Sequence, residues 1–171
     1  GELMLYHQEN TFSTAQLKAG SGASGKLVTQ VKKQLQIAEQ EADLAVIDGS
    51  PGIGCPVIAS MSGVDLVLVV TEPSLSGISD MERILKTAQN FGVRTVICIN
   101  KYDVNLHHTE SIETFCREKG IEMVGKIPFD PAIIKAVNQG ENIVEKGGQA
   151  AKEIQKIYEK TISILMEGVI A

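Results

Sequence analysis

Three apolar runs, rich in β-branched residues, constrain the fold of this chain more than any other feature of its sequence. They are LAVI at 44–47, DLVLVV at 65–70 and TVICI at 95–99. Strands that are covered on both faces of a parallel sheet have nearly continuous apolar sequences, because neither face meets water. Each run therefore predicts a buried strand, and together they favour a parallel sheet.

Between and after these runs, apolar residues recur at helical spacing. Helices are predicted from Leu27, Ile78 and Ile112 onward, at 131–137 and over 149–165. A further short strand is expected at 122–128, and weak alternation over residues 1–17 indicates edge strands. This alternation of strands and helices predicts the α/β class, as a doubly wound, mostly parallel sheet flanked by helices.

Length, charge and cysteine content narrow the class further. A chain of 171 residues suits one domain, and its formal net charge of −5 argues against non-specific binding to nucleic acid. Three scattered cysteines do not suggest a disulfide framework and favour a reducing compartment, so we expect a cytoplasmic protein. No apolar run approaches the roughly 18 residues that a membrane span needs.

The ends of the predicted strands carry the functional argument, because doubly wound sheets bind ligands at the carboxyl ends of their strands. We therefore predict that the strands ending at Ile47, Val70 and Ile99 face one common crevice. After the second strand comes TEPS, in which Thr71 could reach a ligand. The alternative for this stretch is that it only starts the next helix.

The loop after the first apolar run is DGSPGIG, at 48–54. Asp48 follows the predicted strand directly and Gly52 stands four residues further on, which suits a Walker B/switch II segment. The Asp48 carboxylate would hold Mg²⁺, usually through water, and the Gly52 amide could contact a γ-phosphate. The alternative is a tight strand-to-helix turn in which Asp48 caps a helix.

The loop after the third run is NKYD, residues 100–103, which has the N-K-x-D pattern of many GTP-binding proteins. In that pattern the carboxylate of Asp103 would accept hydrogen bonds from guanine, the Asn100 amide would support the base, and Lys101 would pack along it. The alternative is a turn built by Asn and Asp, with a solvated lysine.

A phosphate-loop spacing, G-x-x-x-x-G-K, spans Gly20 to Lys26. A working loop of this kind follows a buried strand and continues with Ser or Thr, whose hydroxyl reaches Mg²⁺. Here Leu27 takes that place, and the residues before Gly20 have only scattered apolar side chains. We interpret the stretch as a loop that caps the following helix, not as a Walker A motif.

Five ordered segments together carry a family resemblance: SGKLV, VIDGSPGIGCPVIAS, VVTEPSLSGISDMER, INKYD and IPFDPAIIKAVNQGE. In this order they resemble the carboxyl-terminal half of the MinD-superfamily P-loop ATPases that carry an inserted ferredoxin domain. The match runs from about Leu17 to about Glu145. The resemblance implies an incomplete P-loop NTPase-like fold. The Walker A segment and the ferredoxin insertion, with its two [4Fe–4S] clusters, would lie upstream of this sequence, which begins with Gly.

The same resemblance implies roles for individual residues. Asp48 would be the Walker B carboxylate and the Mg²⁺ site, and Gly52 a catalytic switch II glycine. Asn100 would contact the base, and the expected nucleotide-binding residues also include Pro51, Thr71, Lys101 and Asp103. Because the resemblance covers far more residues than the N-K-x-D tetrapeptide, it favours ATP over GTP.

For the protein as a whole, the resemblance implies an ATPase that works as a homodimer, with a redox or iron–sulfur protein as partner. The chain would be a single α/β domain, residues 1–171, from the carboxyl-terminal part of a larger nucleotide-binding protein, and inactive by itself. Two alternatives stay open: a GTP-binding protein that recognises guanine through NKYD, and a non-catalytic module for dimerisation or partner binding.

The three cysteines have different expected environments. Cys98 lies in a predicted strand and Cys116 on the apolar face of a predicted helix, so both are expected in the core. Cys55 closely follows the Asp48 loop and is either a buried thiol or exposed at the mouth of the site. We predict that it is accessible to solvent and near a dimer interface.

Overall fold

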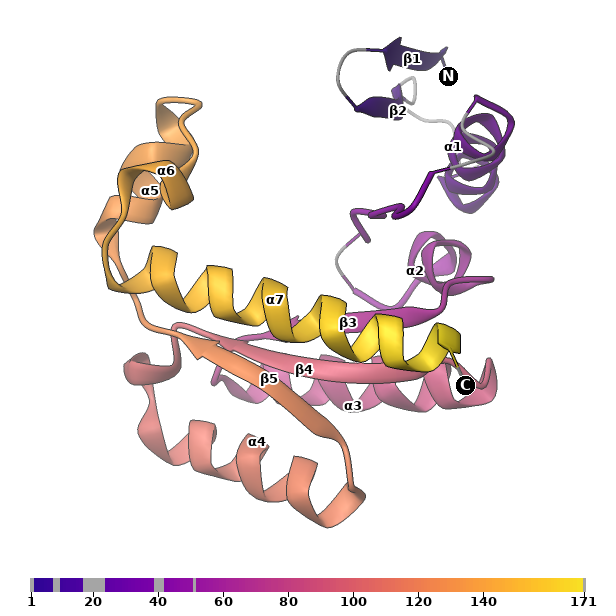
Figure 1. Cartoon of the computed structure of the whole chain (residues 1–171). Coiled ribbons are helices and arrows are strands. Elements are labelled where there is room, and N and C mark those ends of the chain that lie inside the picture. Colours follow the sequence, from indigo (N-terminus) through magenta and orange to yellow (C-terminus); the bar gives the residue numbers. More distant parts are fainter. Residues whose placement is uncertain (1, 8–9, 17–23, 39–41, 51, 171) are drawn as a thin grey trace. The chain divides into compact units, whose positions relative to one another are not determined.

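The computed structural model of this chain describes residues 2–7, 10–16, 24–38, 42–50 and 52–170 (Figure 1). The chain divides into two compact units, Gly1–Val64 and Asp65–Ala171. Each unit is described here by itself, beginning with the larger one.

The larger unit is built on a parallel sheet in the order β3-β4-β5. Its strands are β3 (Leu66–Thr71), β4 (Arg94–Asn100) and β5 (Glu122–Ile127). Its helices are α3 (Leu75–Asn90), the 3₁₀ turn η1 (Tyr102–Val104), α4 (Leu106–Lys119), α5 (Pro131–Asn138), α6 (Ile143–Lys146) and α7 (Gln149–Ile170). Helices alternate with the strands, which confirms the predicted α/β class with a parallel sheet.

Both faces of this sheet are packed, with α3 and α4 on one side and α7 on the other (Figure 1). Ile97 and Ile99 of β4 point toward α3 and α4, where they meet Met81, Ile112 and Cys116. The intervening residues of β4 face α7, and their cluster consists of Val96, Cys98, Val124, Ile157 and Ile164. Because β4 is the central strand and is buried on both faces, its sequence is a continuous apolar run.

The edge strand β3 is buried less completely than its sequence predicts. Val69 faces α3 and α4 and is 5% exposed, but Leu68 and Val70, on the opposite face, are 39% and 57% exposed. The cluster under α7 is centred on β4 and β5, so this helix does not cover the middle of β3. Among the described residues, β3 also has a paired strand on one side only.

The smaller unit begins with an antiparallel hairpin of β1 (Glu2–His7) and β2 (Thr11–Gln16). Two helices follow, α1 (Ser24–Ala38) and α2 (Cys55–Met61). The Ser13 hydroxyl donates a hydrogen bond to the carbonyl of Val31, at 3.1 Å, which joins the hairpin to α1. The weak alternation noted over residues 1–17 thus corresponds to the two strands β1 and β2.

A lysine joins the two helices of the smaller unit. The Lys32 ammonium, on α1, donates to the carbonyls of Ala59 and Ser60 at 3.3 and 3.1 Å, and also to that of Ser62. These carbonyls lie at the end of α2, where a helix leaves its last carbonyl groups without intrahelical partners. Burial lowers the pKa of Lys32 from its ordinary 10.5, because it removes water from the ammonium.

The strand predicted at 44–47 is absent from the structure, where residues 44–50 have no regular secondary structure. Val46 is 79% exposed and Leu44 is 36% exposed. A β-branched apolar run becomes a strand only where a neighbouring strand supplies partners for its backbone groups. No strand among the described residues pairs with this segment.

Candidate functional site

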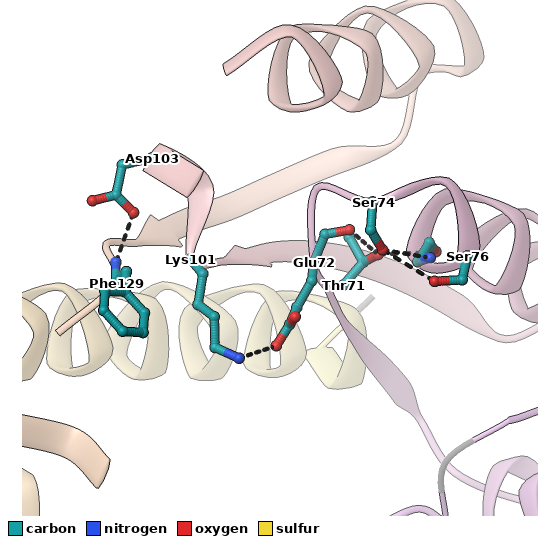
Figure 2. A network of polar contacts seen from close by, with 8 residues as sticks. Thr71, Glu72, Ser74, Ser76, Lys101, Asp103 and Phe129 are labelled. Atoms are coloured by element: carbon teal, nitrogen blue, oxygen red, sulfur yellow. Dashed lines mark hydrogen bonds and ion pairs between the residues drawn. The ribbon is translucent and has the colours of Figure 1, made fainter. Parts of the chain in front are cut away.

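Three loops of the larger unit are joined by polar contacts at the carboxyl ends of β3, β4 and β5 (Figure 2). The strands are parallel and in register, with Thr71 opposite Ile99 and Asn100 opposite Ile127, so they end at one edge of the sheet. The strands that end near Val70 and Ile99 thus share one edge of the sheet, and the common crevice expected there stays a prediction. Ile47 belongs to the other unit, and its part of that prediction stays a prediction.

The loop after β3 is folded tightly against the first turn of α3. The hydroxyl of Thr71, which is 5% exposed, donates to the carbonyl of Gly77 at 3.0 Å. Ser74 caps the helix by accepting from the Gly77 N–H, also at 3.0 Å. A Cβ at Gly77 would lie 2.4 Å from the carbonyl oxygen of Glu72, so this close approach requires glycine. Thr71 and Ser74 therefore serve helix initiation in this structure.

The loop after β4 begins with Lys101 in a left-handed conformation, at φ 54° and ψ 42°. Among the described residues it is the one non-glycine residue with positive φ. Such a conformation costs roughly 1–2 kcal/mol for an L-residue with a Cβ. The Lys101 ammonium lies 2.7 Å from a carboxylate oxygen of Glu72, so an ion pair joins this loop to the loop after β3.

Asp103 makes the corresponding connection to the loop after β5. Its Oδ1 accepts a hydrogen bond from the backbone N–H of Phe129 at 2.7 Å (Figure 2). Glu72 and Phe129, the two partners of the NKYD side chains, were not predicted. Neither has a sequence signal of its own, because each is defined by a partner more than 20 residues away in the chain.

Asn100, the first residue of NKYD, differs from Lys101 and Asp103. It ends β4 and is half-buried. No hydrogen bond joins its side-chain amide to any other described residue. An amide carries two N–H donors and a carbonyl acceptor. Within this tetrapeptide, Asn100 therefore has hydrogen-bonding groups available to a ligand.

Asp48 and Gly52 lie in the smaller unit, in the loop that leads into α2. Asp48 is exposed, and its carboxylate has no ion pair or hydrogen bond with another described residue. Gly52 has φ +89°, a conformation that favours glycine, and the space beside its Cα is open. Pro51 lies outside the described residues. The loop thus presents one free carboxylate and one exposed backbone turn.

The glycine and lysine of the phosphate-loop spacing lie in the first turn of α1. A Cβ on Gly25 would lie 3.1 Å from both Cβ and the carbonyl oxygen of Cys55. Gly25 therefore permits the close approach of α1 to the start of α2. The Lys26 side chain is exposed. Gly20 lies outside the described residues, so the interpretation that this stretch is not a Walker A motif stays a prediction.

The predicted burial of Cys98 and Cys116 and the predicted exposure of Cys55 are confirmed, whereas a dimer interface near Cys55 stays a prediction. Cys55 is exposed, whereas Cys98 and Cys116 are buried. Burial raises the pKa of both buried thiols to about 11, and Glu113 adds to the effect at Cys116. A [4Fe–4S] cluster takes four thiolates, and a chain with two buried thiols and one exposed thiol does not fit that requirement.

The described residues include neither a metal-binding cluster nor a helix that could cross a membrane. No group of three or more His, Cys, Asp or Glu side chains is arranged to hold a metal ion there. In the same part of the chain, every helix is too short or too polar to cross a membrane.

Comparison with known proteins relates most of the chain to one family. The family model for ParA, described as NUBPL iron-transfer P-loop NTPase, matches residues 20–163. The iron-sulfur cluster carrier protein of Pyrococcus furiosus is 28% identical over 158 residues, which cover 84% of this chain and 54% of that protein. The septum site-determining protein MinD of Bacillus subtilis is 30% identical over 119 residues, 67% of this chain and 44% of its own length.

A solved structure has the same fold. The cell division ATPase MinD of Pyrococcus furiosus superposes with a TM-score of 0.66 at 21% identity, covering 83% of this chain and 60% of that one. The chain spans about half the length of the curated relatives it matches.

Proposed function

The chain belongs to the NUBPL iron-transfer P-loop NTPase family of ParA- and MinD-type proteins, and from this premise we propose that it supplies the Walker B, switch II and base-contacting loops of an ATPase. The nucleotide would lie at the carboxyl edge of the sheet. Phosphoryl transfer depends mainly on positioning and charge stabilisation, so these loops are the expected contribution of this half of the protein.

The choice of ATP over GTP rests on a difference between two residues of NKYD, Asn100 and Asp103. The Asn100 amide has no partner among the described residues, whereas Asp103 already accepts a hydrogen bond from Phe129. Adenine presents a donor and an acceptor side by side, which an Asn amide matches with its own acceptor and donor. Guanine recognition would instead use the Asp103 carboxylate. The literal N-K-x-D sequence keeps GTP as the second candidate.

The Asp48 carboxylate is a suitable ligand for the Mg²⁺ of the proposed nucleotide site. Mg²⁺ usually keeps several waters and is bound through one or two carboxylates together with the substrate phosphates. A single, exposed and unpaired carboxylate fits this requirement. When bound, Mg²⁺ would neutralise charge on the β- and γ-phosphates, and the Gly52 loop would respond to the γ-phosphate.

We propose that the phosphate-binding loop lies in another part of a larger protein, of which residues 1–171 form the carboxyl-terminal α/β part. In support, this chain covers only about half of its relatives' length, and Leu27 stands where a Walker A motif has Ser or Thr. The outer edge of β3 has no paired strand among the described residues, so an additional strand has a place there.

The iron–sulfur role is proposed for the complete protein. The family description names iron transfer, and one relative is an iron-sulfur cluster carrier. Since the cysteines of this chain do not fit a [4Fe–4S] cluster, clusters would be held upstream or by a redox or iron–sulfur partner. We expect a cytoplasmic homodimer, with Cys55 near the dimer interface.

Titration calorimetry with ATP and GTP tests this proposal on two proteins: the chain alone, and the chain preceded by a segment with a Walker A loop. The chain alone should bind nucleotide poorly and show no hydrolysis, whereas the extended protein should bind ATP. In the extended protein, Asp48→Ala should abolish hydrolysis, and Asn100→Ala should weaken ATP binding. Asn90→Ala, at an exposed helix end, is the matched control.

Three results would contradict this assignment. Micromolar binding by the chain alone, lost in Lys26→Ala, would make residues 20–26 a phosphate loop after all. A preference of the extended protein for GTP would favour the second candidate. Absence of any nucleotide binding would favour a module for dimerisation or partner binding.

A further inference from the structure

We propose that Asp103 and Lys101 are positioning residues, which hold the loops after β3, β4 and β5 together, and that Asp103 does not recognise a nucleobase. We call the two contacts the strand-end brace: the ion pair of Lys101 with Glu72, and the hydrogen bond from the Phe129 N–H to Asp103. The inference rests on the proposed function for the place of the nucleotide, but the brace itself is a property of this chain.

The brace connects loops that are far apart in sequence. Lys101 lies 2.7 Å from Glu72, which directly follows β3. Asp103 lies 2.7 Å from the backbone nitrogen of Phe129, two residues after β5. The two residues thus point in opposite directions along the sheet edge, one toward each neighbouring strand (Figure 2). A shift of this loop would break both contacts, but the ion pair joins side chains that are 40% and 50% exposed and adds little to stability, so the hydrogen bond of Asp103 is the main connection.

Two backbone carbonyls of this loop, those of Lys101 and Tyr102, also accept hydrogen bonds. The Lys101 carbonyl accepts from the Val104 N–H at 3.1 Å, which closes the η1 turn. The Tyr102 carbonyl accepts from the Thr109 hydroxyl of α4 at 2.6 Å. These contacts hold the backbone around Lys101 and so maintain its left-handed conformation. Strained residues that are held in this way cluster at functional sites.

The direction of the Asp103 hydrogen bond decides its role. To recognise guanine, the carboxylate would turn both oxygens toward the N1–H and 2-amino donors of the base. Here Oδ1 accepts from a backbone N–H of the neighbouring loop, and a charged acceptor makes such a bond stronger than a neutral pair. Recognition of guanine would compete with this bond, whereas adenine recognition through Asn100 leaves it in place.

Substitution by Asn separates the two roles. Asp103→Asn keeps a carbonyl oxygen that can accept from the Phe129 N–H, so it should preserve the brace. The same change replaces a carboxylate oxygen by an N–H₂ donor, which would face the donors of guanine and prevent its recognition. Asp103→Ala removes both functions. Asp65→Ala, at an exposed aspartate without a described partner, is the matched control.

The first experiment measures amide hydrogen exchange at Phe129 by NMR, in the chain as it stands and without nucleotide. Asp103→Ala should accelerate the exchange of this amide by about tenfold, the effect of losing one hydrogen bond of ordinary strength. Asp103→Asn keeps a neutral acceptor, so it should accelerate exchange clearly less than Asp103→Ala does, and Asp65→Ala should leave the rate within about twofold of the unsubstituted chain. Equal acceleration by Asn and Ala, or no acceleration by Ala, would overturn the proposal.

The second experiment measures ATP and GTP affinity in the protein extended with a Walker A segment. Asp103→Asn should change both affinities by less than about twofold, because the brace remains. A selective loss of GTP binding by more than about tenfold would show that Asp103 recognises guanine. If the extended protein binds no nucleotide, the proposed function fails, and the exchange rate of Phe129 still decides whether Asp103 acts as a brace.

Discussion

The two units of this chain are stabilised in different ways. In the larger unit, a central strand is buried on both faces, and Ile97, Ile99 and Ile112 are completely inaccessible to solvent. In the described part of the smaller unit, the buried side chains are Val57, Ser60 and Met61, all on α2. There a lysine bound to backbone carbonyls joins the helices. Loops of the larger unit can therefore be supported by a hydrophobic core, whereas loops of the smaller unit must rely on local contacts.

Exposed apolar side chains show the same difference. Phe12, Ile37 and Val46 of the smaller unit are 60%, 76% and 79% exposed. Their burial would require partners other than the described residues of that unit. We therefore expect the larger unit to carry most of the cooperative stability of this chain.

The largest expected effect comes from truncating isoleucine in each unit. Ile97→Ala removes a fully buried side chain from the larger unit and should lower the free energy of unfolding by about 2–5 kcal/mol. Ile37→Ala, at a mostly exposed position of the smaller unit, should change it by less than about 0.5 kcal/mol. Urea denaturation followed by circular dichroism measures both. Similar losses for the two variants would contradict the comparison.

Thiol labelling should distinguish the units by about two orders of magnitude in rate. Cys55 is exposed, whereas burial raises the pKa of Cys98 and Cys116 to about 11, so near pH 8 they carry about a hundredfold less thiolate than an ordinary cysteine. One equivalent of label should react quickly with the native chain. The other two should react only with added denaturant, and rapid native labelling of all three would show that the core is open.

The lysine contact of the smaller unit should have a moderate effect. Lys32→Met removes the donor to the carbonyls at the end of α2 but keeps an apolar stem of similar length. Desolvation of the ammonium offsets part of its hydrogen bonding, so we expect a local loss of about 1–2 kcal/mol. Hydrogen exchange of the α1 and α2 amides measures this loss. Lys33→Met, at the next and exposed position, is the control and should leave their exchange unchanged.

The smallest effect concerns backbone strain. In the smaller unit Gly52 has a positive φ, and in the larger unit Lys101, which has a Cβ, also has a positive φ. Lys101→Gly and Lys101→Ala both remove the ion pair, but Gly also removes the strain. The Gly variant should be the more stable by about 0.5–1 kcal/mol in urea denaturation. At Lys86, exposed within α3, the order should reverse because Gly is the poorer helix former. The same order at both positions would mean that Lys101 is not strained.

Comparison of particular elements shows how far local sequence determines this structure. The run 95–99 became the central strand, and the helix predicted at 131–137 is α5, which begins at Pro131 behind the cap residue Asp130. These predictions succeeded because periodicity and helix capping depend on residues within a few positions of one another. The equally apolar run at 44–47 did not become a strand, because the partner that a strand requires is not encoded in the strand itself.

The sequence by itself determined the α/β class, the parallel sheet, the family and the placement of NKYD and TEPS at the ends of strands. Only the tertiary structure decided what the side chains there contact: Lys101 contacts Glu72, Asp103 contacts Phe129, and Asn100 has no partner in the part of the chain that is described. It also decided that Gly25 serves helix packing. The physical reason is that these contacts join residues more than 20 positions apart. Their distances depend on the register of the sheet and the packing of helices, which no local pattern records.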